Sequence, residues 1–234
     1  MEKTKILILE ANPHEDLHLN DEMRDVQNVI RQSQACEEFE IAFAPAVKST
    51  DLQHLMSDHK PNMVHFCGHG AGQDGLVFRD RKIDAGKLSH IFESCQHYLQ
   101  CVVLNACYSE VQANEIVKYI PYVIGINDTI ADKDAIAFSM GFYSALGYRR
   151  SFQYAYRCGC KAIENLKNSN GFLNRDVIAE ESRRLAPIEE IRKLVPINDI
   201  SEARITPEQL KPVVFKKKEF IHKEKSEMLE EHFN

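Results

Sequence analysis

Two short polar segments carry the residues best suited to covalent chemistry. Cys67-Gly-His-Gly-Ala-Gly72 follows one apolar run and contains His69, and Asn105-Ala-Cys-Tyr-Ser109 follows another and contains Cys107. A free thiol with a pKa of ~8.5 is mostly protonated at neutral pH, and a neighbouring imidazole can remove its proton. If these two side chains meet, Cys107 is a candidate nucleophile and His69 its general base.

The apolar runs before these segments predict two neighbouring strands. Residues 63–66 and 101–104 each read as a buried parallel strand, with one crossover between them. Sites in open parallel sheets form beyond the carboxyl ends of the strands, and neighbouring strands lie ~4.8 Å apart. This arrangement brings His69 close to Cys107.

The glycines around His69 fit a site that a substrate backbone approaches closely. Gly68 and Gly70 leave room for such an approach, and we expect the strand to end at Gly68. The backbone N–H groups of Gly70 and Cys107 are candidates for an oxyanion hole. A helix is expected directly after Cys107, and its positive N-terminal end favours a thiolate.

The rest of the chain alternates strands with helices, which predicts an α/β fold with a mostly parallel sheet. Further strands are expected at 5–10, 39–43 and 122–126, and a small hairpin at 75–83. Helices are expected at 21–31, from Thr50-Asp51 to Met56, and at 87–98, 110–119 (capped by Ser109), 134–146 and 152–166. After Asn168 the chain becomes charged, and helices are expected at 175–194, 207–210 and 216–233.

Composition limits the class of protein. The 234 residues carry a formal net charge of -6, which gives no electrostatic reason to expect nucleic acid or an anionic membrane as a partner. No segment approaches the ~20 apolar residues of a membrane-spanning helix. The seven cysteines come without a secretion signal, so we expect reduced thiols and a cytoplasmic protein.

The two polar segments also carry a resemblance to a known family. Pro61-Asn-Met-Val-His-Phe-Cys-Gly-His-Gly70 and Val102-Val-Leu-Asn-Ala-Cys-Tyr-Ser109 resemble the signature segments of the CHAT domain, a family of caspase-like peptidases. The resemblance extends from the run at 6–13, through 122–127, to a closing segment at 212–215.

The resemblance implies a caspase-like three-layer sandwich, with a mostly parallel central sheet and helices on both faces. It implies a cysteine endopeptidase in which His69 and Cys107 match the catalytic pair, with no metal or organic cofactor. A protein or peptide is then the substrate. A regulatory protein partner in a bacterial defence or cell-death pathway is also expected. We expect residues 1–215 to form the peptidase domain and residues 216–234 a polar helical tail.

Substrate selection is expected beside the fifth strand. Asn127 and Asp128 follow this strand, and Asp128 could select a basic residue before the scissile bond. The alternative is an ordinary solvated loop with no role in binding.

Other functions remain open from the residues alone. One is a caspase-like interaction module without catalysis. Another is a zinc site made by His65, Cys67, His69 and Cys107, since the first three alternate along one strand. A phosphate loop at 68–75 is disfavoured because no Gly-Lys-Ser/Thr closes it.

Overall fold

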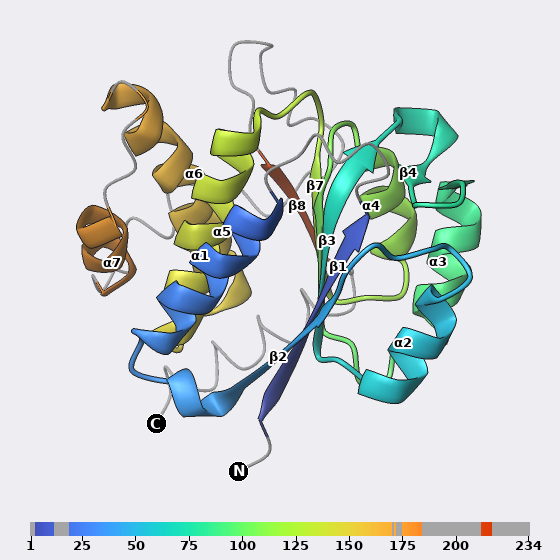
Figure 1. Cartoon of the computed structure of the whole chain (residues 1–234), viewed down its shortest axis with the longest axis horizontal. Coiled ribbons are helices and arrows are strands. Elements are labelled where there is room, and N and C mark those ends of the chain that lie inside the picture. The colour runs from blue at the N-terminus through green and yellow to red at the C-terminus, as the bar shows by residue number, and fades with distance from the viewer. Residues whose placement is uncertain (1–2, 12–18, 170, 172–174, 184–211, 217–234) are drawn as a thin grey trace, which may run out of the picture.

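A computed structural model describes residues 3–11, 19–169, 171, 175–183 and 212–216, and its centre is a mostly parallel sheet (Figure 1). The order of the main strands is β2-β1-β3-β6-β7-β8. The first five run parallel, and β8 pairs with β7 in the antiparallel sense. Their bounds are β1 Thr4–Ala11, β2 Phe39–Ala44, β3 Met63–Gly70, β6 Cys101–Asn105, β7 Tyr122–Ile126 and β8 Pro212–Lys216.

Helices cover both faces of this sheet (Figure 1). One layer holds α1 (Leu19–Arg31), α5 (Asp132–Gly147), α6 (Phe152–Asn168) and α7 (Arg175–Arg183). The other holds α2 (Leu52–His59), α3 (Ala85–Glu93) and α4 (Glu110–Ile116). The predicted three-layer α/β arrangement is therefore confirmed.

Burial on both faces explains the continuous apolar runs of the strands. In β1, Ile6 and Ile8 pack against the layer of α1, α5 and α6, whereas Leu7 and Leu9 pack against the layer of α2, α3 and α4. Successive side chains of a strand point to opposite faces, so a strand covered on both sides needs apolar residues at every position. The sheet thus separates two hydrophobic cores.

Helices α5 and α6 pack together through glycines. A methyl group added at Gly141 would overlap the carbonyl of Cys158, and one added at Gly159 would overlap the ring of Phe138. Every residue of α5 from Ala137 to Gly147 is buried. Helix α5 is therefore enclosed by the sheet on one side and by its neighbouring helices on the others.

A short hairpin follows β3, as predicted for residues 75–83. Strand β4 (Leu76–Val77) pairs with the end of β3, and β5 (Lys82–Ile83) pairs with β4. The 3-10 turns η1 (Cys36–Glu38) and η2 (Gly72–Asp74) precede β2 and β4. The hairpin thus begins directly after the segment that contains His69.

Several expected boundaries were wrong. Strand β3 does not end at Gly68 but continues to Gly70, because Gly68 pairs with Ala11 of β1, and the last two residues of β3 pair with β4. The helices expected at 87–98 and 110–119 end at Glu93 and Ile116.

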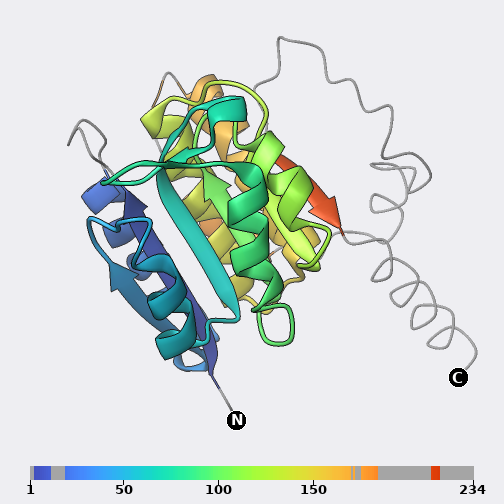
Figure 2. The same ribbon diagram turned by 90° about the vertical axis from the view of Figure 1, so that its right-hand side faces the viewer.

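The C-terminal predictions are only partly within the described residues. The helix expected at 175–194 is described as α7 over Arg175–Arg183, and the segments at 207–210 and 217–234 lie outside the described residues. Lys216, expected to begin a tail helix, is the last residue of β8. Figure 2 shows β8 at the sheet edge beyond β7.

Two further features concern the cysteines and the helices. All seven cysteines are free thiols in the structure. Among the described residues, none of the helices has both the length and the apolar character needed to cross a membrane.

Candidate active site

The two polar segments meet at the carboxyl ends of β3 and β6. These strands are paired in parallel, with Cys67 opposite Asn105, so His69 and Cys107 each lie two residues beyond a matched pair. A methyl group added at Gly70 would overlap the carbonyl of Cys107, so the two backbones are in contact there. The expected proximity of the His69 and Cys107 segments is present in the structure.

His69 lies on a strand and not on a free loop. Its backbone is paired with Val77 of β4, and its side chain is half-buried. The continuation of β3 through Gly68 and Gly70 therefore holds the His69 backbone between β4 on one side and the Cys107 segment on the other.

The thiol of Cys107 faces the loop between β7 and α5. The backbone N–H of Ile130 donates a hydrogen bond to the half-buried Cys107 Sγ at 3.4 Å, and this Sγ lies 3.8 Å from the Ile130 carbonyl oxygen. The thiol thus accepts from the N–H of Ile130 and donates to the carbonyl oxygen of the same residue, which fixes the position of the sulfur.

A sharp turn presents this cysteine. Tyr108 has a φ of 52°, which lies in the left-handed region. This conformation is energetically unfavourable for any residue other than glycine. Its backbone N–H donates to the Asp128 carbonyl oxygen at 3.0 Å. The loop after β7 thus contacts both Cys107 and Tyr108.

The Ser109 side chain stabilises this turn, but it does not cap helix α4 as expected. It occupies the position before α4, yet its buried Oγ donates to the Leu104 carbonyl oxygen and accepts from the Ile126 N–H, both at 2.9 Å. Ser109 therefore joins the ends of β6 and β7. The side chain of Gln112 in α4 donates to the Gly72 carbonyl oxygen at 2.7 Å, which ties the segment after His69 to the same helix.

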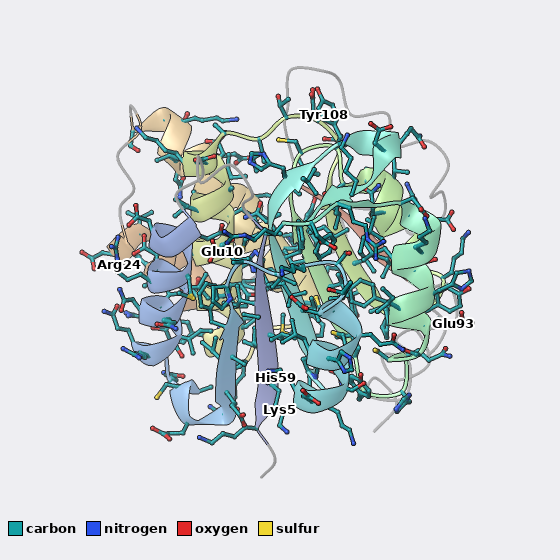
Figure 3. The ribbon with its side chains drawn as sticks, turned by 45° about the vertical axis from the view of Figure 1, so that its right-hand side comes forward. Lys5, Glu10, Arg24, His59, Glu93 and Tyr108 are labelled. Atoms are coloured by element: carbon teal, nitrogen blue, oxygen red, sulfur yellow. The ribbon has the colours of Figure 1, made fainter. Side chains whose placement is uncertain are left out.

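Asn127 and Asp128 directly follow β7, and both are half-buried at this end of the sheet. Asp128 Oδ1 accepts the Thr129 N–H at 2.7 Å. The Asp128 carboxylate also accepts the Tyr108 hydroxyl; this hydrogen bond and the carboxylate charge raise the pKa of Tyr108. Figure 3 shows Tyr108 at the opposite end of the molecule from Lys5, which lies near the start of β1.

Behind the two segments lies a buried polar cluster that includes a residue the sequence did not single out. Glu22 of α1 is buried, and its Oε1 accepts from Asn105 Nδ2 and from Ser139 Oγ, each at 2.6 Å. His65 Nε2 lies 3.3 Å from the same oxygen. An acidic residue in the first turn of a helix usually faces solvent, so no local signal marked Glu22.

The alternative zinc set is not assembled as predicted. Within the described residues, the group close enough to share an ion is Glu22, His65 and Cys67, and it does not include His69 or Cys107. Burial, together with the charge of Glu22 and a hydrogen bond to it, raises the pKa of the Cys67 thiol well above its usual range. Cys67 is thus a protonated packing residue, unlike the half-buried Cys107.

Comparisons with known proteins agree with this architecture. The family model of the CHAT domain matches residues 9–150. A "Probable protease" from Gillisia limnaea is 24% identical over 170 residues, which cover 68% of this chain and 30% of that protein. A "Roc-COR-CHAT protease" from an unknown prokaryotic organism is 26% identical over 139 residues, 54% of this chain and 13% of that protein. The chain therefore spans less than a third of either relative.

Solved structures show the same fold at low identity. A secreted C11 cysteine protease from Bacteroides thetaiotaomicron, "iotapain", matches with a TM-score of 0.52 and 10% identity, over 70% of this chain and 62% of that chain. The structure of pro-sf-caspase-1 matches with a TM-score of 0.50 and 14% identity, over 92% of each chain. The fold is thus caspase-like, and because the family model covers the chain from β1 to the end of α5, this chain belongs to the CHAT domain family.

Proposed function

We propose that this chain is a cysteine endopeptidase in which Cys107 is the nucleophile and His69 the general base. The observation that carries the proposal is the backbone contact between Gly70 and Cys107, which joins the ends of the two strands. Both curated relatives described above are named as proteases, which supports the same chemistry.

In the proposed reaction His69 removes the proton from Cys107 Sγ, and the thiolate attacks the carbonyl carbon of the scissile peptide bond. The negative charge that develops on the carbonyl oxygen is stabilised by the backbone N–H groups of Gly70 and Cys107. The C–N bond then breaks, and His69 transfers its proton to the departing amine. Water, deprotonated by His69, attacks the thioester, and the carboxylate product leaves as Cys107 regains its proton.

The proposed substrate pocket lies on the loop after β7. Asp128 and Asn127 are half-buried, and the Asp128 carboxylate accepts a hydrogen bond from the Tyr108 hydroxyl. We propose that a lysine or arginine side chain of the substrate pairs with this carboxylate. If so, Asp128→Asn lowers cleavage after basic residues and spares cleavage after leucine, whereas equal losses for both would exclude this pocket.

We also propose control by a protein partner or by the charged segment after Asn168, in a bacterial defence or cell-death pathway in the cytoplasm. Both curated relatives are much longer than this chain, so their matched segments are one part of a larger protein. In this proposal residues 1–215 form the peptidase domain and residues 216–234 a polar tail. Deleting residues 216–234 would then change the rate of peptide cleavage relative to the full chain. If this deletion and the addition of cell extract both left the rate unchanged, such control would be excluded.

Labelling and proteomics test the catalytic proposal directly. Peptidyl acyloxymethyl ketones should modify wild-type protein at Cys107, and Cys107→Ala and His69→Ala should abolish both labelling and cleavage in a proteome-wide profile. Cys36→Ala is the matched control, since Cys36 is also half-buried but lies before β2, and it should retain both. A Cys107→Ala variant that keeps every biological effect would instead favour a non-catalytic interaction module.

A further inference from the structure

One buried carboxylate contacts both strands that end in the candidate active site. Glu22 Oε1 accepts from Asn105 of β6 at 2.6 Å and lies 3.3 Å from His65 Nε2 of β3. It also accepts from Ser139 of α5 at 2.6 Å, so one atom links two strands and a helix to α1. Glu22 and His65 have side chains only 4% and 1% exposed, which removes competition from water.

The hydrogen-bond donors around Glu22 keep its carboxyl group ionised. Burial alone would raise the pKa of this carboxyl, but the hydrogen bond and charge of His65, with hydrogen bonds from Ser139 and Asn105, lower it instead. His65 Nε2 faces this carboxylate at 3.3 Å. On the other side of the ring, His65 Nδ1 lies 2.9 Å from the Tyr143 hydroxyl oxygen, and this contact orients the ring.

The strand residues that contact Glu22 lie on β3 and β6, only a few residues before the candidate catalytic pair. Asn105 precedes Cys107 by two residues, and His65 precedes His69 by four, on the same face of β3. Cys67, opposite Asn105 in the ladder, also hydrogen-bonds to Glu22. A shift of β3 against β6 would therefore break contacts to Glu22 and change the separation of His69 and Cys107.

We infer that Glu22 is a positioning residue that fixes the carboxyl ends of β3 and β6 relative to each other, and with them His69 and Cys107. Its effect on catalysis rests on the proposed peptidase function. Its effect on the strand ends does not, so the two parts can be tested separately.

The same atoms could be taken for a metal site, because the ligand atoms of Glu22, His65 and Cys67 lie within 4.8 Å of one another. The donors argue otherwise. Asn105 and Ser139 both direct hydrogen atoms at Glu22 Oε1, the oxygen that lies 3.3 Å from His65 Nε2, and burial keeps the Cys67 thiol protonated. These contacts make Glu22 Oε1 an acceptor that several hydrogen-bond donors share.

The test compares Glu22→Ala and Glu22→Gln with Val26→Ala in the full chain. Val26 lies one turn further along α1 and is equally buried, but it packs in the apolar core and so controls for general destabilisation. With a fluorogenic peptide taken from the cleavage profile, Glu22→Ala should lower kcat by about 10- to 100-fold, the size expected for a displacement of roughly 1 Å. KM should stay within about twofold, since ground-state binding is not removed.

Hydrogen exchange gives a readout that does not need turnover. Glu22→Ala should speed amide exchange in peptides that cover 66–70 and 104–108, relative to Val26→Ala. Glu22→Gln, which retains an acceptor oxygen, should lie between the wild type and Glu22→Ala in both assays.

Two results would overturn the inference. One is equal exchange at both strand ends in Glu22→Ala and Val26→Ala. The other is stoichiometric zinc in purified wild-type protein that is lost in Cys67→Ser. If the wild type cleaves no peptide but the exchange difference is present, the peptidase proposal fails while the structural role of Glu22 is supported.

Discussion

Replacing Ser109 by alanine gives a test of the site whose magnitude follows from the structure. The Oγ of this fully buried residue is the partner of two backbone groups, the Leu104 carbonyl and the Ile126 N–H. A buried polar group left without a partner costs about 1–3 kcal/mol, so losing both costs about 2–6 kcal/mol. We therefore expect Ser109→Ala to be among the most destabilising serine substitutions in this chain.

Thermal and urea unfolding measure this cost. In a chain of this size each 1 kcal/mol lowers Tm by about 2–4 °C, so a loss of about 3 kcal/mol lowers it by about 6–12 °C. Ser94→Ala is the matched control, because Ser94 is exposed at the end of α3, where its Oγ donates to the nearby Ile91 carbonyl and lies 3.6 Å from Cys95 Sγ. The control should change stability by less than about 0.5 kcal/mol.

The same variant should also weaken the site, because Ser109 joins β6 to β7 two residues after Cys107. Labelling of Cys107 by a peptidyl electrophile, measured well below the Tm of the variant, should be slower than in the control. A Ser109→Ala protein as stable as the wild type, with an unchanged labelling rate, would refute the reasoning that this hydroxyl holds the turn.

Three further predictions concern the neighbours of the candidate pair. Gly70→Ala should lower turnover by about 100-fold or more while the fold persists by circular dichroism, since the added methyl overlaps the carbonyl of Cys107; Gly86→Ala, in helix α3 and free of backbone overlap, should stay active. Iodoacetamide at pH 8 should modify Cys107 but not Cys67 in the native protein, because burial raises the pKa of Cys67; mass spectrometry showing equal modification of both would contradict this. The pKa of Glu22 is lowered from its ordinary value of 4.5, so its stabilising contribution is complete above that value and is lost as the pH falls through the folded-state pKa. Urea unfolding should thus show the stability gap between wild type and Glu22→Gln shrinking from pH 6 to pH 3, and a gap independent of pH would count against an ionised Glu22.

The sequence predicted those elements whose boundaries depend only on residues that are neighbours along the chain. The run Tyr122–Ile126 was predicted with its bounds, because a continuous apolar segment between a proline and polar residues has few alternatives to a buried strand. The end of β3 was missed because Gly68 reads as a strand breaker. In the structure this glycine is required by the close approach of Ala11, a contact made across the sheet and not along the chain.

The site shows the same division. The proximity of His69 and Cys107 followed from strand order alone, since both segments end neighbouring strands. Glu22 could not be predicted in this way, because Asn105 and Ser139 lie 83 and 117 residues away in the sequence. Whether an acidic residue on an amphipathic helix faces water or a buried partner depends on which strands lie beneath that helix.

The glycine contacts between α5 and α6 bear on where this fold can be divided. The match to the family model ends at Arg150, before α6 begins. A fragment cut at that point would expose one side of α5, including Phe138 and Gly141, whose surfaces are shaped to fit α6. Such a fragment should aggregate or remain partly folded, so a unit able to fold alone needs α6, and with it α7, whose Ile178 lies in the same core, and β8, which pairs with β7. A neighbouring domain fused to this fold is therefore expected to join it beyond β8 and not at the point where the family match ends.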